Sequence, residues 1–223
     1  MRCLRQTTAE ERRGREMAMI RRWWCWAALV AGGIIGACAH DELPLVCQSA
    51  RTGDIAISEI RGKQSGTDTW GEWLEFFNAS SRELSLRGLD VRMSKLDGSG
   101  EQHLVVRSPH TLAPGSYFVF GRFSESNLPE HVDAGFLVDF DSDLYGEGVY
   151  DLLCGDADNL VDRVVLNGNL PSQGTLSLDG RLTPSAAAND EAQNWCPDAS
   201  SASDGGSQLG LPGSPGRENR PCG

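Results

Sequence analysis

The sequence has 223 residues, of which 39% are hydrophobic, and its formal net charge is −11. Its length is enough for one domain with a sizeable core, and its apolar content is that of a globular chain. Because an acidic chain repels phosphate backbones and anionic lipid, nucleic acid is excluded as a favoured partner, whereas calcium is chemically suitable.

The amino-terminal segment has the pattern of a secretory signal. Two arginines precede an apolar run over residues 23–35, which is too short to span a bilayer. The leader 1–37 holds seven arginines and three glutamates, so its removal leaves 13 basic and 28 acidic residues and a net charge of −15. Met17 or Met19 is an alternative start, since the leader is unusually long.

Cys38 stands directly after two small residues, Gly36 and Ala37. The stretch IIGAC resembles the lipobox of bacterial lipoproteins, and the resemblance implies cleavage before Cys38 and acylation of that cysteine. Ala39 follows, so the aspartate that retains such lipoproteins in the inner membrane is absent. We therefore expect a lipid anchor in the outer membrane of a Gram-negative bacterium. The alternatives are an ordinary secretory signal and a retained amino-terminal anchor.

Four further cysteines lie outside the leader and the lipobox: Cys47, Cys154, Cys196 and Cys222. An even number in an oxidising compartment predicts two disulfides. Three pairings are open, and the sequence does not choose among them. We favour Cys196 with Cys222, which closes the Gly/Ser/Pro-rich tail into a loop and leaves Cys47 for Cys154. Metal binding is the rival use, but neither a CxxC pair nor clustered histidines support it.

Residues 53–223 have the size of a single domain, and residues 38–52 are expected to form a short tether before it. Within the domain the hydrophobic residues alternate at a period of two and almost nowhere at 3.6. In chain order, the expected strands cover residues 54–60, 72–78, 83–93, 101–108, 116–122, 149–154, 160–166 and 174–180. Turn residues separate them, and Asp97-Gly98 predicts a hairpin. The pattern predicts an all-β, antiparallel sandwich of about eight strands.

The carboxyl-terminal part has weaker patterning. Residues 185–194 lack an apolar stripe, so we expect coil there in preference to a single helical turn. The segment after Cys196 is too poor in apolar residues to fold alone, and we expect the domain to hold it.

Six motifs follow one another along the chain: IAISEI, GEWLEFFN, LSLRGLDV, LAPGSYFVF, LVDRVVL and LGLPGSPGREN. Together and in this order they resemble the lamin tail domain in its bacterial form, over roughly residues 53–219. The resemblance implies an immunoglobulin-like β-sandwich that is generally regarded as non-catalytic, found in nuclear lamins and in exported bacterial proteins. Two positions depart from the family pattern: Leu211 replaces an expected threonine, and Phe77 stands where tyrosine is common.

Two carboxylates in the second strand first suggest a catalytic pair. The alternation, however, points Glu72 and Glu75 in opposite directions. If the first two strands are neighbours, Glu59 and Glu75 could approach each other, and a glycosidase needs two facing carboxyls about 5–10 Å apart. We favour the alternative, in which both glutamates accept hydrogen bonds of the fold.

Asp139, Asp141 and Asp143 follow a D-x-D-x-D spacing that could present carboxylates to calcium. The EF-hand pattern fails, because Leu144 replaces the required glycine and Tyr150 the bidentate glutamate. We favour a solvated acidic loop over a calcium site.

The sequence thus predicts a non-catalytic, membrane-anchored envelope lipoprotein that uses its sandwich as a binding or structural module. Its partner would be an envelope protein or a glycan, with neither a cofactor nor nucleic acid involved. The alternatives are a calcium-stabilised adhesion module and, as the less favoured one, a hydrolase that uses Glu59 and Glu75.

Overall fold

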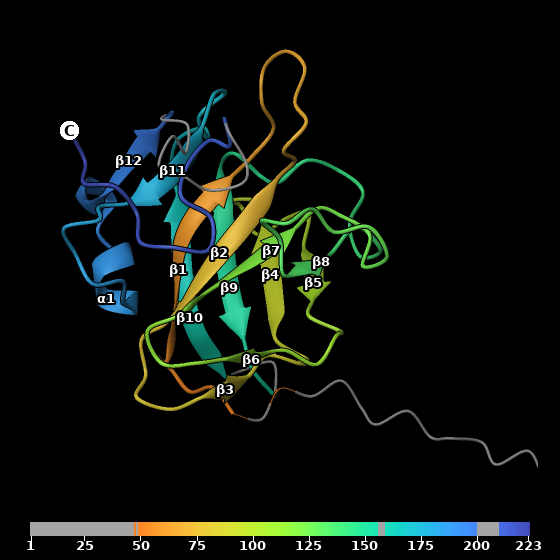
Figure 1. Ribbon diagram of the computed structural model, residues 1–223, viewed down its shortest axis with the longest axis vertical. Coiled ribbons are helices and arrows are strands. Elements are labelled where there is room, and N and C mark those ends of the chain that lie inside the picture. Colours follow the sequence, from red (N-terminus) through yellow and green to blue (C-terminus); the bar gives the residue numbers. More distant parts are fainter. Residues whose placement is uncertain (1–46, 48, 156–158, 200–209) are drawn as a thin grey trace, which may run out of the picture. The chain divides into compact units, whose positions relative to one another are not determined.

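The computed structural model describes residues 47, 49–155, 159–199 and 210–223 (Figure 1). The leader and Cys38 lie outside the described residues. The strands are β1 (Ile55–Arg61), β2 (Trp73–Asn78), β3 (Leu84–Ser85), β4 (Asp90–Ser94), β5 (Gln102–Val105), β6 (Thr111–Leu112), β7 (Tyr117–Gly121), β8 (Ala134–Gly135), β9 (Gly148–Leu153), β10 (Leu160–Leu166), β11 (Thr175–Leu178) and β12 (Trp195–Asp198). Between β11 and β12 lie a single helical turn, α1 (Ala186–Asn189), and a 3-10 turn (Ala192–Asn194).

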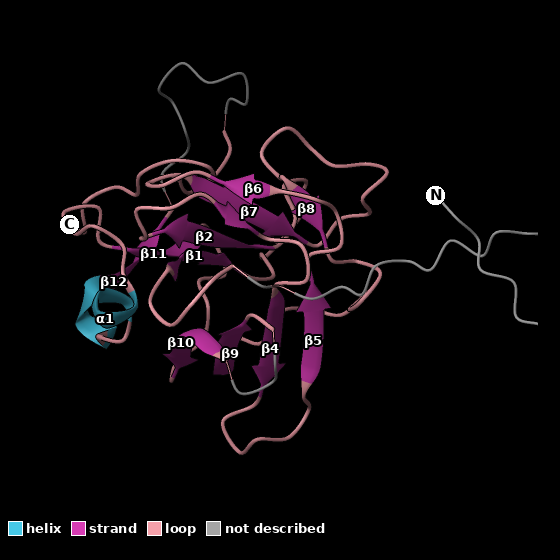
Figure 2. Ribbon diagram, turned by 90° about the horizontal axis from the view of Figure 1, so that it is seen from below, coloured by secondary structure: helices cyan, strands magenta, loops and turns pink. Residues whose placement is uncertain are grey.

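The strands form two large sheets and one small one. The larger sheet has the order β12-β11-β1-β2-β7-β8, the smaller sheet has the order β10-β9-β4-β5, and β3 pairs with β6. Figure 2 shows the two large sheets as separate layers, with α1 beneath β12 on the β10 side of the smaller sheet. The pairings are antiparallel except that of β7 with β8. The predicted antiparallel sandwich is therefore confirmed.

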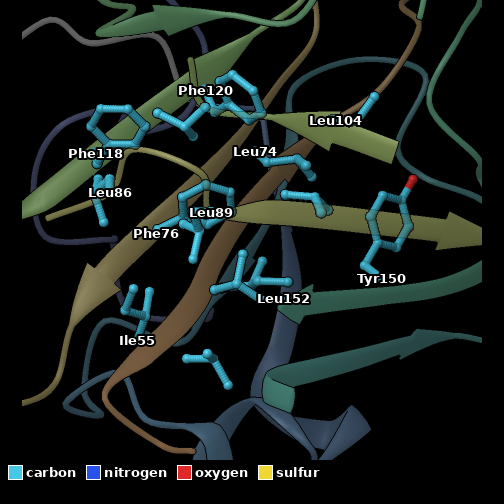
Figure 3. Close-up of a cluster of buried hydrophobic side chains, with 14 of the residues drawn as sticks. Ile55, Leu74, Phe76, Leu86, Leu89, Leu104, Phe118, Phe120, Tyr150 and Leu152 are labelled. Carbon is cyan, nitrogen blue, oxygen red and sulfur yellow. The ribbon is translucent and has the colours of Figure 1, made fainter. Parts of the chain in front are cut away.

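The core lies between the two large sheets (Figure 3). On β2, Leu74 and Phe76 face inward, and they share one buried cluster with Tyr150 and Leu152 of the smaller sheet. Each such buried side chain contributes about 1.5–3 kcal/mol of hydrophobic stabilisation. The period of two predicted for this strand thus separates its core positions from its outward ones.

The outer face of the larger sheet is covered as well. Trp73 and Val119 point outward from β2 and β7, and they form a second buried cluster with Val132 and Leu211. Leu211 belongs to the carboxyl-terminal segment 210–216, which crosses this face. Because both faces are covered, β1 and β2 are buried at every position, as strands enclosed on both sides must be.

Several predicted elements differ from the structure. The expected strand 83–93 is split into β3 and β4, because Gly88 turns the chain with a φ of 83°. The strands β6, β8 and β12 were not predicted, since two to four residues are too few to show alternation. The segment 185–194 is not all coil: Ser185 caps α1 by accepting a hydrogen bond from the Ala188 amide.

Two disulfides close the domain. Cys47 is bonded to Cys154, and Cys196 to Cys222, so the structure forms both of the favoured pairs. Cys47 and Ala50 are buried in the main core, and the end of the segment expected as a tether therefore packs against the sandwich. In the described part of the chain, no helix has both the length and the hydrophobicity needed to cross a bilayer.

Candidate functional site

Glu59 and Glu75 are cross-strand neighbours on the outer face of the larger sheet. The register places them directly opposite each other, and both residues have 0% exposed surface. The sequence left open whether the two glutamates approach each other across neighbouring strands, and the register shows that they do. Their complete burial was not expected, because it depends on a segment far away in the chain.

The carboxylate of Glu59 accepts hydrogen bonds at both oxygens. Trp73 Nε1 donates to Oε1 at 2.9 Å, and Ser177 Oγ donates to Oε2 at 2.9 Å. Ser214 donates to Oε2 from both its backbone nitrogen, at 3.0 Å, and its hydroxyl, at 3.2 Å. Burial raises the pKa of Glu59, and these hydrogen bonds oppose that effect.

Glu75 has fewer donors. Ser58 Oγ lies 2.7 Å from its Oε1, and the Gly216 backbone nitrogen lies 2.7 Å from its Oε2. Burial, followed by the neighbouring charge of Glu59, raises the pKa of Glu75 well above its usual range. Glu59 thus accepts more hydrogen bonds than Glu75, and the pKa of Glu75 is raised further above its usual range than that of Glu59.

These bonds attach the carboxyl-terminal segment to the sheet. The single hydroxyl proton of Ser214 is shared between Glu59 Oε2 and Asn219 Oδ1, which lies 2.7 Å from Ser214 Oγ, and Asn219 Nδ2 donates to the Ser58 carbonyl at 2.8 Å. Gly213 passes so close to the sheet that a Cβ there would lie 2.7 Å from Thr175 Cγ2. Segment 210–216 is therefore a docking segment for the outer face, and it binds the sheet at the two glutamates.

The geometry argues against a hydrolase on this pair. A glycosidase needs both carboxyls open to the bond that is cleaved. Glu59 and Glu75 have no exposed surface, and backbone and side-chain donors occupy their oxygens. The favoured alternative, hydrogen bonding within the fold, describes what these residues do.

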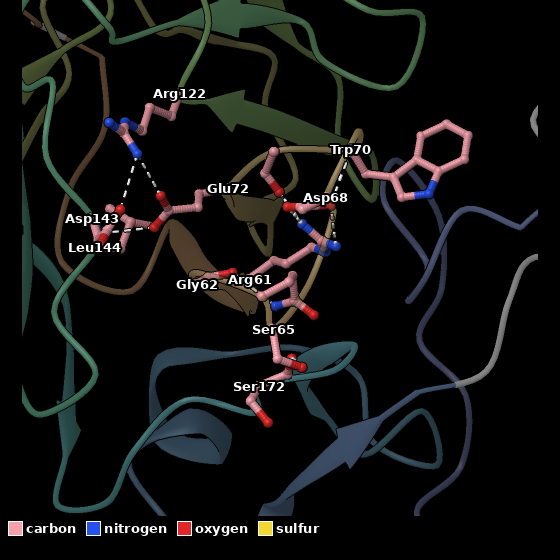
Figure 4. Close-up of polar contacts among 12 residues, drawn as sticks. Arg61, Gly62, Ser65, Asp68, Trp70, Glu72, Arg122, Asp143, Leu144 and Ser172 are labelled. Carbon is pink, nitrogen blue, oxygen red and sulfur yellow. Dashed lines mark hydrogen bonds and ion pairs between the residues drawn. The ribbon is translucent and has the colours of Figure 1, made fainter.

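Glu72 lies apart from this pair, as the alternation predicted, and lines a polar hollow of about 500 Å³ (Figure 4). Its carboxylate accepts hydrogen bonds from Arg122 Nη1 and from the Leu144 backbone nitrogen, both at 2.8 Å. Burial raises the pKa of Glu72, and these two donors offset part of that effect.

The charges around the polar hollow are matched in pairs. Arg122 also contacts Asp143 at 3.1 Å, and Lys63 Nζ lies 2.8 Å from the other oxygen of that aspartate. Arg61 binds Asp68 through two parallel bonds of 2.9 Å (Figure 4). Because the charges of these side chains are compensated, the hollow offers a charged ligand little net attraction.

The three aspartates of the calcium hypothesis are not brought together. Asp139 accepts from Arg107 and from the Val105 backbone, whereas Asp143 pairs with Lys63. The backbone carbonyl of Asp141, not its carboxylate, contacts Arg122. Among the described residues, no group of three or more Asp, Glu, His or Cys side chains could hold a metal ion. The arrangement thus gives no support to calcium binding.

Asp162 and Asn189 form a polar plug that sequence reasoning missed. Beside Ile57, β11 no longer pairs with β1, and Asp162 Oδ2 accepts the Ile57 amide at 2.7 Å instead. Asn189 Nδ2 donates to the Ile57 carbonyl at 2.9 Å and to Asp162 Oδ2 at 2.7 Å. Two side chains thus take the place of a missing strand neighbour. Their separation in sequence, 27 residues, leaves no local signal.

The comparisons with known proteins give one match: residues 48–168 fit the model of the Lamin Tail Domain. The chain belongs to the lamin tail domain family. Neither a curated protein nor a solved structure matches.

Family membership agrees with the observed sandwich and confirms the immunoglobulin-like fold expected from the resemblance. The matched residues end before the docking segment 210–216. The two departures from the family pattern fit the structure: Phe77 packs against Tyr117 with ring centroids 4.9 Å apart, and Leu211 is buried in the outer cluster. The lamin tail domain is a family of non-enzymatic, immunoglobulin-like domains.

Proposed function

We propose that this protein is an exported lipoprotein of the cell envelope, held in the outer membrane by a lipid on Cys38. Its lamin tail domain is a non-catalytic module that binds or scaffolds an envelope partner. One observation supports the non-catalytic part of the proposal. Glu59 and Glu75, the best catalytic candidates in the sequence, are buried beneath segment 210–216 and accept hydrogen bonds from it.

Two features support export. The domain contains two disulfides, which form and persist in oxidising compartments. The signal pattern of the amino-terminal segment supports secretion, and the IIGAC stretch before residue 39 supports lipidation of Cys38.

Metabolic labelling with an alkyne analogue of palmitate tests the anchor. We expect the wild-type protein to take up label and the Cys38→Ser variant to lose it. Cys25→Ser is the matched control, because it removes a cysteine of the same leader and should leave labelling unchanged. Density-gradient fractionation should place the labelled protein with outer membranes.

Undiminished labelling of Cys38→Ser would contradict acylation at that residue. A protein released unlabelled into the periplasm or the medium would indicate an ordinary secretory signal instead.

A further inference from the structure

The larger sheet extends past the smaller one on one side. The smaller sheet ends at β10, which packs against β1, whereas the larger sheet continues beyond β1 to β11 and β12. The inner side of these two strands is therefore not covered by a facing strand. At the border of this region, α1 packs against β1 and β10.

A hollow of about 310 Å³ occupies this uncovered region, and we name it the overhang hollow. Leu176 of β11 and Trp195 of β12 supply apolar walls and also pack against the main core. The turn after β10 and the turn after α1 supply the polar rim. The volume falls within the range of about 300–1,000 Å³ typical of small-ligand sites.

The polar rim consists of Asn167, Asn169 and Asp190, all exposed. Within the described residues, their side chains make no hydrogen bond or ion pair. The fold does not use these groups, so they are free to bind a ligand. The wall that the structure describes includes no lysine or arginine.

The aromatic wall is held in place. Trp195 Nε1 donates to the Asn189 carbonyl at 2.8 Å, which fixes the indole ring against α1. Asn194 Nδ2 donates to the Ala188 carbonyl at 2.8 Å and ties the following turn to the same helix. A preorganised wall lowers the entropy cost of binding a ligand.

These properties select one ligand class. Carboxamides both donate and accept hydrogen bonds, as sugar hydroxyls do. The carbon-bound hydrogens of a sugar ring pack against an apolar aromatic surface such as an indole. An acyl chain would offer the rim amides no hydrogen bond, and an anion would meet Asp190 and, in the described part of the wall, neither lysine nor arginine.

We propose that the overhang hollow is a binding site for a neutral oligosaccharide, with Trp195 as the aromatic wall and Asn167, Asn169 and Asp190 as hydroxyl partners. This inference deepens the proposed function, on which it rests, because it assigns the envelope partner to the class of neutral glycans.

The test uses the full chain, purified in a detergent without a sugar headgroup. The probes are maltotetraose, cellotetraose, mannotetraose and the tetramer of N-acetylglucosamine, and binding is measured by saturation-transfer NMR and calorimetry. We expect at least one probe to bind with a Kd of about 10 μM to 1 mM.

The Asn167→Ala/Asn169→Ala double variant should weaken that binding about tenfold or more, because it removes two hydroxyl partners. Both residues are exposed and unpaired, so the fold should be unaffected. Asn127→Ala, which removes an exposed amide far from the hollow in sequence and outside its wall, is the matched control and should bind as wild type. Trp195→Leu should also lose binding, with a thermal melt recorded to separate lost binding from lost folding.

The inference would be overturned if no probe bound at a concentration of about 10 mM, ten times the upper limit of the expected Kd. It would also be overturned if the double variant bound sugar as tightly as wild type, or if the hollow bound an extended peptide in place of sugar. Acylation is measured separately. A labelled protein that binds no sugar leaves the proposed anchor standing, whereas a sugar-binding protein without label rejects the anchor alone.

Discussion

Glu59 and Glu75 face each other across two neighbouring strands, and neither has any contact with solvent. Two charged carboxylates in this position would repel each other strongly. Glu59 accepts hydrogen bonds from Trp73, Ser177 and the Ser214 backbone and shares the Ser214 hydroxyl with Asn219, whereas Glu75 accepts from Ser58 and Gly216. This difference in donors favours the charged form at Glu59 and the protonated form at Glu75.

The first prediction concerns pH. A carboxyl whose pKa is raised by folding stabilises the native state fully at pH values below its unfolded-state pKa, which is near 4.5 for Glu75. This stabilisation is lost as the pH rises through the folded-state pKa. Glu75→Gln removes that loss, because an amide mimics the protonated acid. Above pH 4.5, we expect the free energy of unfolding of the variant to rise relative to that of wild type by up to about 1 kcal/mol per pH unit. Urea unfolding at several pH values measures this difference.

Glu59→Gln is the control for this prediction. Every donor around Glu59 points at an oxygen, so an amide nitrogen there must face an N–H or displace a hydroxyl. We expect a loss of about 1–3 kcal/mol at neutral pH. If Glu75→Gln followed the wild-type pH profile, the proton would not reside on residue 75.

The second prediction concerns the close contact between the docking segment and the larger sheet. Gly213 and Gly210 have φ angles of 75° and 90°, so alanine strains the backbone at both. Only at Gly213 would the new Cβ also collide with Thr175 and Glu59, whereas Gly210 faces open space. We expect Gly213→Ala to cost about 1–3 kcal/mol more than Gly210→Ala.

Hydrogen exchange distinguishes the two glycine variants locally. Gly213→Ala should speed the exchange of the Ser214 and Gly216 amides, which donate to the buried glutamates. Equal stability and equal exchange in the two variants would show that the segment is not tightly docked.

The third prediction concerns the polar plug. Asp162 Oδ2 alone accepts the bonds from Ile57 and Asn189, while Oδ1 is buried and has no partner among the described residues. Asp162→Ala should cost about 2–4 kcal/mol, because it leaves two buried donors unpaired. Asp162→Asn keeps one oxygen for both bonds and should retain most of that stability. Equal losses in the two variants, measured by thermal unfolding, would mean that the carboxylate charge matters and not the accepting oxygen.

The fourth prediction concerns calcium. Asp139 and Asp143 are engaged by Arg107, Lys63 and Arg122, so binding a cation would first require these ion pairs to break. We expect calorimetric titration at millimolar calcium to give no saturable heat. Saturable heat that disappears in Asp143→Asn would restore the adhesion hypothesis.

The sequence was enough to predict which side chains of the main strands face the core, but not which short strands complete the edges of the sheets. The period of two places Leu74 and Phe76 inside and Trp73 and Glu75 outside, because each strand is long enough to repeat the pattern. By contrast, β12 has four residues, one of them Pro197, and it is a strand only because β11 offers it an edge.

In the candidate sites too, contacts between adjacent strands could be predicted, whereas contacts between distant parts of the chain could not. The approach of Glu59 to Glu75 follows from strand adjacency, which the motif order makes visible. The contact of Glu59 with Ser214 spans 155 residues, and the overhang hollow joins Asn167 to Trp195 across two turns and a strand. Tertiary packing alone creates such neighbours, and a local pattern cannot show them.

The docking of segment 210–216 also bears on when the protein can fold. The buried carboxylate of Glu59, on β1, receives its backbone donor from Ser214, which is synthesised long after β1. A chain that stops short of this segment would expose the outer cluster and leave a charged group without that donor. Contacts of such separation close slowly, so the sandwich is completed only after nearly the whole sequence is present. A nascent chain that lacks this segment would therefore keep β1 without its final partner.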